Sequence, residues 1–526
     1  MTTSPVTQRQ ASQSAPAKAS SQPHPAHQLT VRRLGVDTYR EPVVFMRSDC
    51  VVCRSEGFEA LSRVTVTVDG RSILATLNVV HGDLLAPHTA GLSEAAWLHL
   101  GAREGALATF SHAPPVESFA RVRGKLYGAR LSDDDLLAII EDIAAHRYTD
   151  VQLSAFVSAC AERLDDDEVV GLTRAMLATG DQLEWPAPVV VDKHCVGGLP
   201  GNRTTPIVVA IVAANGLVMP KTSSRAITSP AGTADTMEQL APVDLDLPAL
   251  RRVVADVGGC IAWGGSVQLS PADDVLIRVE RALDIDTEGQ LVASVLSKKA
   301  AAGSTHVLID IPMGPTAKVR TPLDAARLER LLRRVGTALG LRVEVVVTDG
   351  RVPVGRGIGP ALEAYDVIGV LQRATGAPDD LRARALILAG ALLELGGAAA
   401  SGGGLALAEQ TLDSGAAWTR FQAICDAQGG IRLPGRAPHV EVVPAPHDGT
   451  VASFDNRELS RAAKLAGAPG APTAGIRLRV SRGDSVELGA PLFEVHAESR
   501  GELRYALDYI AAHPGIIRVE PAPEAA

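Results

Sequence analysis

Residues 191 to 206, VDKHCVGGLPGNRTTP, combine a lysine, a histidine, glycines and hydroxyls directly before an apolar segment. We expect a strand to end at Asp192 and the following apolar run to begin a helix. Such a junction presents free backbone N–H groups and the positive end of a helix dipole. Lys193 adds a full charge, and Thr204 and Thr205 add hydroxyl donors, a set that suits phosphate. The alternative is an ordinary glycine-rich turn, since this loop is neither a Walker loop nor a dinucleotide fingerprint.

A second stretch of the same kind spans residues 220 to 240, PKTSSRAITSPAGTADTMEQL. It gathers hydroxyls around an arginine and a glycine just before a predicted helix: Ser223, Ser224, Thr228, Ser229 and Thr233 around Arg225 and Gly232. Hydroxyl-rich loops are commonly just turns. Here, however, two loops with the same residue types fall in one predicted domain. Together they indicate a substrate that carries phosphate, or phosphate beside a sugar.

The composition limits the class of partner. The chain has 526 residues, a formal net charge of -9 and 3% aromatic residues, which argues against a broad nucleic-acid surface or a base-stacking platform. No apolar run reaches the length of a membrane span. Its six cysteines are scattered, as in proteins of a reducing cytosol, and the pair Cys50 and Cys53 lacks a second zinc-ligand pair. We therefore predict a cytoplasmic protein that binds small molecules, with no membrane, nucleic-acid or metal partner.

The elements that must position the two loops follow from the hydrophobic patterns. Short branched runs predict strands at both ends of the chain, capped amphipathic runs predict helices after Phe119, and strands alternate with helices in the middle. The fold class is multidomain α/β: a helical lobe plus an α/β lobe with a mainly parallel sheet, flanked by small β-rich N- and C-terminal domains. The predicted parts are a disordered tail (1–28), a β-rich N-terminal domain (29–117), a helical lobe (118–187), an α/β phosphate- and substrate-binding domain (188–432) and a β-rich C-terminal domain (438–520).

Three motifs carry a resemblance to a known family. They are KHCVGG at residues 193–198, SSRAITSPAGTADTMEQL at 223–240 and ASVLSKKAA at 293–301. With them the chain resembles the thymidine/pyrimidine-nucleoside phosphorylase family, roughly from Phe119 to the C-terminal domain. The added N-terminal β domain and the stretch GGLPGNRTT make it similar to the type 2 branch, which includes the AMP phosphorylases.

The resemblance implies a pentosyltransferase in which inorganic phosphate attacks the sugar C1′ and the base leaves. Its substrate would be thymidine, giving thymine and 2-deoxyribose 1-phosphate. The alternative is a nucleoside 5′-monophosphate, giving free base and ribose 1,5-bisphosphate. Phosphate is already a nucleophile, so the enzyme must position it, exclude water and help the base leave. The resemblance implies no cofactor, with phosphate as co-substrate, and a homodimer or larger homo-oligomer.

The same resemblance assigns roles to residues of this chain. Lys193, Thr205, Ser223 and Thr233 would hold phosphate, His194 would approach the base, and Asp286 would donate a proton to it. Asp286 would then have to stay protonated, which burial favours, and its alternative role is an exposed helix-capping acid. The remaining substrate-binding positions are Gly198, Ser224, Arg225, Ala226, Ile227, Thr228, Ser229, Ser294, Lys298 and Lys318, of which Arg225 is expected to brace its loop.

Departures from the family pattern bear on the substrate. Cys195 stands where a serine is usual, Ser229-Pro230 replaces a usual His-Thr pair, and Pro200 looks inserted; the last two favour the AMP-type branch. Two rival functions stay open. An anthranilate phosphoribosyltransferase-like enzyme would need magnesium, with Asp273-Asp274 as the nearest acidic pair. A non-catalytic nucleotide sensor would keep the loops without turnover.

Overall fold

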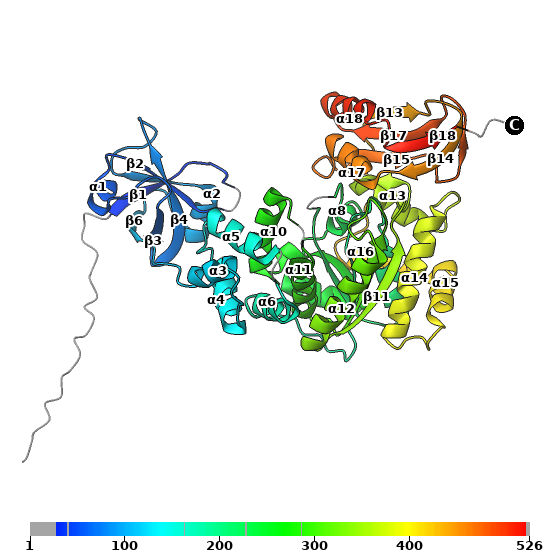
Figure 1. Ribbon diagram of the computed structural model, residues 1–526, viewed down its shortest axis with the longest axis horizontal. Helices are drawn as coiled ribbons and strands as arrows, with labels where there is room; N and C mark the ends of the chain where they lie inside the picture. Colours follow the sequence, from blue (N-terminus) through cyan, green and yellow to red (C-terminus); the bar gives the residue numbers. More distant parts are fainter. Residues whose placement is uncertain (1–27, 39–40, 162–163, 227–228, 286, 522–526) are drawn as a thin grey trace, which may run out of the picture. The chain divides into compact units, whose positions relative to one another are not determined.

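The computed structural model describes residues 28–38, 41–161, 164–226, 229–285 and 287–521, and the chain forms two compact units, 1–117 and 118–526 (Figure 1). The described part of the first unit is a closed barrel with strand order β1-β5-β2-β4-β3-β6. Alternate residues of β3, such as Val64 and Val66, are buried in its core, as the two-residue period of a strand requires. Its elements are β1 (Gln28–Arg33), β2 (Val43–Arg47), α1 (Val51–Glu56), β3 (Arg63–Val68), β4 (Arg71–Val80), β5 (Thr89–Leu92), α2 (Glu94–Leu100) and β6 (Leu107–His112).

A helical lobe begins the second unit with α3 (Phe119–Leu126), α4 (Asp133–Ala144), α5 (Asp150–Ala161) and α6 (Asp166–Ala178). Ser132 and Asp165 each close a capping box at the start of α4 and α6, so local sequence fixes where both helices begin. The acids in each first turn also complement the helix dipole.

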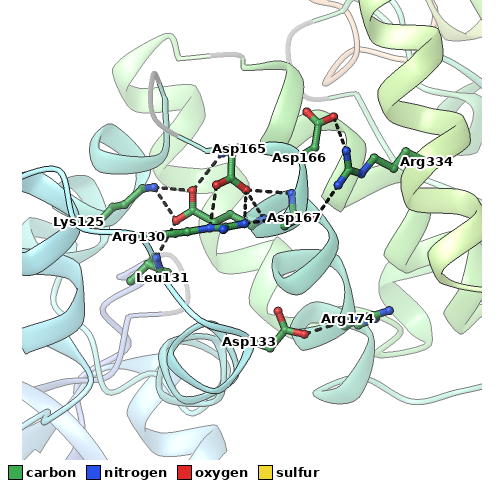
Figure 2. Close-up of polar contacts among 10 residues, drawn as sticks. Lys125, Arg130, Leu131, Asp133, Asp165, Asp166, Asp167, Arg174 and Arg334 are labelled. Carbon is green, nitrogen blue, oxygen red and sulfur yellow. Dashed lines mark hydrogen bonds and ion pairs between the residues drawn. The ribbon is translucent and has the colours of Figure 1, made fainter.

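Charged side chains tie this lobe together (Figure 2). The buried Lys125 Nζ donates to both oxygens of Glu168, at 2.6 and 2.7 Å, and the backbone N–H of Leu131 donates to the same carboxylate. Arg334, from α12 (Pro322–Ala338), pairs with Asp166 at 3.2 Å and with Asp167, and so joins α6 to the α/β domain. Glu168 therefore fixes α6 against the segment that leads into α4.

The lobe also contains two helices from much later in the sequence. They are α10 (Pro271–Leu283) and α11 (Glu288–Ala301), which pack on α4, α5 and α6. Both helices fall within the range predicted as the α/β domain, 188–432, although they pack on helices of the predicted helical lobe, 118–187. Amphipathic periodicity identifies a helix but does not say which domain its apolar face packs against.

A parallel sheet forms the α/β domain, in the order β9-β8-β7-β10-β11. A parallel bridge between Val190 and Val218 joins its two parts. The strands are β7 (Val191–Cys195), β8 (Met219–Ser223), β9 (Gly259–Trp263), β10 (His306–Met313) and β11 (Arg342–Asp349). The confirmed prediction is thus a mixed α/β protein with a helical bundle and an α/β domain, although β8 was not recognised as a strand.

The core of this domain lies around α7 (Thr205–Ala214). Its apolar residues are buried on every side, for example Ile207, Val208 and Ile211. A helix that is apolar all round is a central one, and its start is therefore held firmly. The surrounding elements are α8 (Thr233–Glu238), α9 (Leu247–Val257), η2 (Gly264–Ser266), α12, β12 (Gly357–Ile358), α13 (Pro360–Leu371), α14 (Asp379–Leu395), α15 (Gly404–Asp413) and α16 (Ala416–Ala427).

The C-terminal domain consists of two small sheets with two helices. One sheet has the order β12-β15-β17-β13 and the other β16-β14-β18. The short strand β12 comes from the range predicted as the α/β domain, and two helices accompany the strands in the range predicted as β-rich. The elements are β13 (His439–Pro444), β14 (Gly449–Phe454), α17 (Asn456–Leu465), β15 (Gly475–Leu478), β16 (Ser485–Val486), β17 (Pro491–Ala497), α18 (Arg500–Ala512) and β18 (Ile517–Glu520).

None of the helices in the described ranges has the length and apolar character needed to cross a membrane.

Candidate active site

The site lies where the strand order of the parallel sheet reverses. The chain passes from β7 to β8 and β9 on one side, and then returns to β10 on the other side of β7. In open parallel sheets, ligands bind beyond the carboxyl ends of the strands at such a reversal. The first loop, residues 196–204, leaves β7 at this point, and the second loop, described over residues 224–226 and 229–232, leaves β8 beside it.

Lys193 is buried at the base of the first loop. Its side chain is 1% exposed, and its Nζ donates to Thr204 Oγ1 at 2.7 Å. Burial lowers the pKa of Lys193, while the thiol of Cys195 and the carboxylate of Asp310 act in the opposite direction. Because an ammonium group only donates, Thr204 must accept here, and its own hydrogen is available to another acceptor. Lys193 thus supplies a desolvated hydrogen-bond donor at the base of the loop.

Two glycines let the first loop approach neighbouring backbone closely. Gly198 has φ +80, and a Cβ there would lie 2.5 Å from the backbone nitrogen of Lys318. Gly201 has φ +68, and its Cβ would lie 2.3 Å from the Val354 carbonyl oxygen. Neither a side chain nor an ordinary backbone conformation fits at these positions. The first loop therefore packs against the segments that follow β10 and β11. The exposed Lys318 lies in the first of these segments, next to Gly198.

The second loop places hydroxyls beside the first. Ser223, the last residue of β8, is 8% exposed, and its Oγ has no hydrogen-bond partner among the residues that the structure describes. Asp235 Oδ2 accepts from the backbone N–H groups of Ala226 and Gly232, at 2.7 and 2.8 Å, and so folds the loop back on itself. Thr233 then begins α8. A buried hydroxyl without a partner is costly, and an anion in the cradle would accept its hydrogen.

Arg225 braces the second loop in this structure. Its Nη1 and Nη2 donate to the two oxygens of Glu238, at 2.5 and 2.9 Å. Its guanidinium also lies over the Trp263 ring, 4.9 Å from the centroid. These contacts hold the charge of Arg225 within the loop.

Four lysines, three of them buried, act electrostatically on His194. Asp192 accepts from Lys299 Nζ at 2.7 Å, and Lys221 Nζ lies 3.6 Å from the same carboxylate. Burial, opposed by Asp192 and reinforced by Lys299, lowers the pKa of Lys221 to about 7. Burial and the neighbouring charges of Lys299, Lys221, Lys193 and Lys298 hold the pKa of His194 well below 6.5. The imidazole is therefore neutral at physiological pH. Its single N–H can donate a hydrogen bond, but the ring is not an imidazolium that could act as a general acid.

Helix α11 carries the predicted base-contacting residues. Ser294 and Lys298 are both half-buried on it, and Lys298 pairs with the buried Asp273 of α10. Burial would lower the pKa of Lys298, but the charges of Asp273, Asp274 and Glu280 outweigh it and raise the pKa. Since Lys298 also acts on His194, these two residues share one electrostatic environment.

The other predicted positions differ in how far they are buried. Thr205 is buried at the start of α7, whereas Ser224 and Ser229 are exposed on the second loop and Ala226 is half-buried. Cys195 receives a hydrogen bond from Asn202 Nδ2 at 3.4 Å, and burial raises the pKa of its thiol to about 12, so it acts as an anchor within the first loop. Three predicted site residues lie outside the described part of the chain: Ile227, Thr228 and Asp286.

Sequence reasoning missed the residues that join the two loops. Arg203 donates to Thr233 Oγ1 at 2.8 Å and to the Ala231 carbonyl at 2.9 Å, and it pairs with Glu363 at 2.6 Å. The available signal was its position within GNRTT, after Gly201-Asn202 and before two threonines. Glu363 follows 160 residues later, so no local pattern could reveal it.

The described residues contain no group of three or more His, Cys, Asp or Glu side chains arranged to hold a metal ion. The geometry instead offers an anion cradle of buried lysine, hydroxyls and two helix starts. A neutral histidine and a paired lysine lie beside it. Such a set can bind phosphate and present hydrogen-bond donors to a planar polar group.

Three family models match the chain. They are described as "Glycosyl transferase family, a/b domain" over residues 187–418, "Glycosyl transferase family, helical bundle domain" over residues 122–180, and "Pyrimidine nucleoside phosphorylase C-terminal domain" over residues 450–516. Both loops lie within the first match, and the third covers most of the C-terminal domain.

Curated relatives match almost the whole chain. A protein of Polaromonas sp. (strain JS666 / ATCC BAA-500) named "Putative thymidine phosphorylase" is 62% identical over 494 residues, covering 94% of this chain and 97% of the relative. One of Hahella chejuensis (strain KCTC 2396) with the same name is 59% identical over 493 residues, covering 94% and 98%. Among solved structures, the anthranilate phosphoribosyltransferase of Thermus thermophilus is 19% identical with a TM-score of 0.48, covering 58% of this chain and 98% of that one.

The phosphate-type cradle and the family models agree on the kind of enzyme. The loops lie in the matched α/β domain, the bundle in front of it is matched separately, and relatives at 59 to 62% identity extend through both. The chain is a glycosyltransferase of the pentosyltransferase type, and it belongs to the thymidine/pyrimidine-nucleoside phosphorylase family.

Proposed function

We propose that this enzyme cleaves thymidine with inorganic phosphate, giving thymine and 2-deoxyribose 1-phosphate. The observation that carries the proposal is the cradle of buried donors at the strand ends: Lys193 with its ammonium group, and Ser223 with an Oγ that lacks a partner in the described ranges. Thr205 and Thr233 add hydroxyls at two helix starts. The printed names of the relatives support the choice of thymidine.

In this mechanism the protein positions the reactants and stabilises charge. Lys193, Ser223 and Thr233 hold phosphate so that one of its oxygens forms a bond to C1′ as the bond from C1′ to the base nitrogen breaks. The bonding electrons leave with the base, which gains negative charge. The neutral His194 donates a hydrogen bond to the base, and the Lys298 ammonium adds a positive charge near it. Asp286 remains the proposed source of the proton that the base takes up.

A second substrate class, nucleoside 5′-monophosphates, is favoured by one observation. The close approach of Gly198 brings the backbone of Lys318 against the first loop, and the Lys318 side chain is exposed there. A further ammonium group beside an anion cradle suits a substrate with a phosphate of its own. Cleavage would then give free base and ribose 1,5-bisphosphate.

The deciding experiment measures base release by chromatography from thymidine, uridine, AMP, CMP and UMP, each with and without phosphate. Phosphate-dependent release from thymidine, with AMP untouched, is the expected result. Release from the monophosphates alone would instead support the second substrate class. In that case Lys318→Met should raise KM for the monophosphate. If thymidine is the substrate instead, its cleavage should be insensitive to this substitution.

The same assay tests the remaining proposals. We propose that no metal or organic cofactor takes part, so activity should survive excess chelator; a magnesium requirement would favour a phosphoribosyltransferase instead. No base release under any of these conditions would favour a non-catalytic binding protein. We further propose a cytoplasmic homodimer or larger homo-oligomer, which light scattering of the purified enzyme would test.

A further inference from the structure

Arg203 belongs to the first loop of the site and forms hydrogen bonds with the second loop and the start of α8. It follows Asn202, which has a left-handed backbone with φ 55, and the backbone N–H of Asn202 bonds to the Val354 carbonyl. This turn directs the Arg203 side chain into the domain, where it is 12% exposed. An arginine of the first loop therefore contacts the second loop through its side chain.

The guanidinium fixes the direction of one hydroxyl. Its Nη1 donates to Thr233 Oγ1 at 2.8 Å, and its Nη2 donates to the Ala231 carbonyl at 2.9 Å. A guanidinium cannot accept a hydrogen bond, so Thr233 Oγ1 is the acceptor, and its hydrogen must point elsewhere. The arginine also draws electron density from that oxygen, which makes the hydroxyl a better donor to an anion.

Glu363 holds the guanidinium in place. This carboxylate of α13 is 2% exposed and accepts from Arg203 Nε at 2.6 Å, from Thr236 Oγ1 at 3.1 Å and from the Gly359 backbone at 3.2 Å. Such a paired and saturated carboxylate can fix the rotamer of its partner. Arg203 thus has a defined orientation rather than a range of surface conformations.

Resting on the function proposed above, we propose that Arg203 is a positioning residue: it turns the Thr233 hydroxyl toward phosphate and holds the second loop at a fixed distance from the first. It acts through Thr233 and the Ala231 carbonyl and does not itself contact the reacting atoms. Lysine cannot replace it, because a single ammonium group cannot reproduce three directed hydrogen bonds in the plane of a guanidinium.

The test is calorimetric titration of inorganic phosphate into the full-length protein. The variants are Arg203→Lys, Thr233→Val and the double variant, with Thr233→Ser as the conservative rescue. We expect Arg203→Lys and Thr233→Val each to weaken phosphate binding about tenfold, the size of one lost hydrogen bond to a charged ligand. Because Arg203 acts in large part through Thr233, the loss of affinity in the double variant should be clearly smaller than the sum of the two single losses. Thr233→Ser should bind like the wild type.

The matched control is Arg63→Lys in the first unit. Arg63 is 13% exposed and pairs with Glu41 at 2.9 Å, so the substitution removes a similar pair far from both loops in sequence, and its phosphate affinity should not change. If Arg203→Lys does not fold, Glu363→Gln carries the same prediction, since it releases the guanidinium. Unchanged affinity in Arg203→Lys, fully additive losses, or no phosphate binding by the wild type would each overturn the proposal.

Base release is measured in parallel with the titrations. If the wild type binds phosphate and the variants follow the expected pattern, but no nucleoside or nucleotide is cleaved, the proposed function fails and the role of Arg203 stands. If cleavage occurs while the two substitutions act independently, the role of Arg203 fails and the proposed function stands.

Discussion

His194 shows how neighbouring charges decide what one side chain can contribute. Burial first, and then the charges of four lysines, hold the pKa of its imidazole well below 6.5. A ring that stays neutral donates a hydrogen bond equally well across the physiological range. Its contribution to turnover should therefore not follow the titration of an ordinary histidine.

We expect His194→Gln to lower kcat/KM about 10- to 100-fold, and by the same factor from about pH 6 to pH 8. Glutamine keeps a donor but changes its position. The measurement is the ratio of wild-type to variant kcat/KM at each pH, because the ratio cancels other groups that titrate, such as Lys221. A ratio that rises as the pH falls through 6.5 would reveal an imidazolium acid and would contradict this account.

The same lowered pKa predicts an effect on stability. Below about pH 6.5, His194 binds a proton in the unfolded chain but stays neutral in the folded chain. Lowering the pH therefore lowers the free energy of unfolding until the pKa of His194 in the folded chain is reached. His194→Gln removes this group. Denaturant titrations between about pH 6.5 and 5.5 should therefore show a smaller loss of stability in the variant than in the wild type.

At the scale of the elements, the C-terminal domain contacts the segment that leads into the helix carrying Glu363. Strand β12 pairs with β15, and the next helix, α13, carries Glu363. Gly359 lies between them with φ +130, and a Cβ there would be 2.3 Å from the Ala474 carbonyl oxygen. The contact between the C-terminal sheet and α13 therefore leaves no room for a side chain.

We expect Gly359→Ala to destabilise the fold by about 2–3 kcal/mol and also to raise KM for phosphate, since it moves the helix that carries Glu363. The matched control is Gly340→Ala, which has φ +74 but whose added Cβ meets nothing within 4 Å. The control should cost only about 1 kcal/mol and leave KM unchanged. An unchanged KM in Gly359→Ala would separate the C-terminal sheet from the phosphate site.

The elements also show what the sequence could and could not predict. Apolar strands before polar loops, as at β7 and β10, were predictable because residue type and local turn chemistry determine them. The sequence did not predict the strand β8, because its residues MPKTS include proline, lysine and hydroxyl side chains, which rarely mark a buried strand. All five are buried in the structure. The predicted loops do lie side by side, but Glu363, which connects to both through Arg203, comes from a distant helix. Long-range pairings of this kind depend on tertiary packing.

At the scale of the whole molecule, the two units have separate cores. The barrel of residues 28–38 and 41–117 is closed on itself, and every described residue of the predicted site belongs to the unit 118–526. We expect a chain that starts at Ser118 to keep phosphate-dependent base release. Its kcat/KM should lie within about threefold of that of the full chain, a difference in activation free energy of under about 1 kcal/mol. A shortened chain that melts cooperatively but releases no base would show that the barrel contributes to turnover.

The path of the chain through the helical lobe has a consequence for how this enzyme can be altered. The chain builds α3 to α6, leaves for β7, β8 and β9, and returns to add α10 and α11 to the same bundle. A fragment cut after Gly180 would expose the face of α6 that α11 covers. The bundle can therefore not be exchanged between relatives as a single cassette. A chimaera must carry residues 119–301 as one block, and that block includes both loops of the candidate site. The residues proposed to hold phosphate and to contact the base, from Lys193 to Lys298, would therefore be exchanged together, and substrate preference would have to be altered by individual substitutions among them or at Lys318.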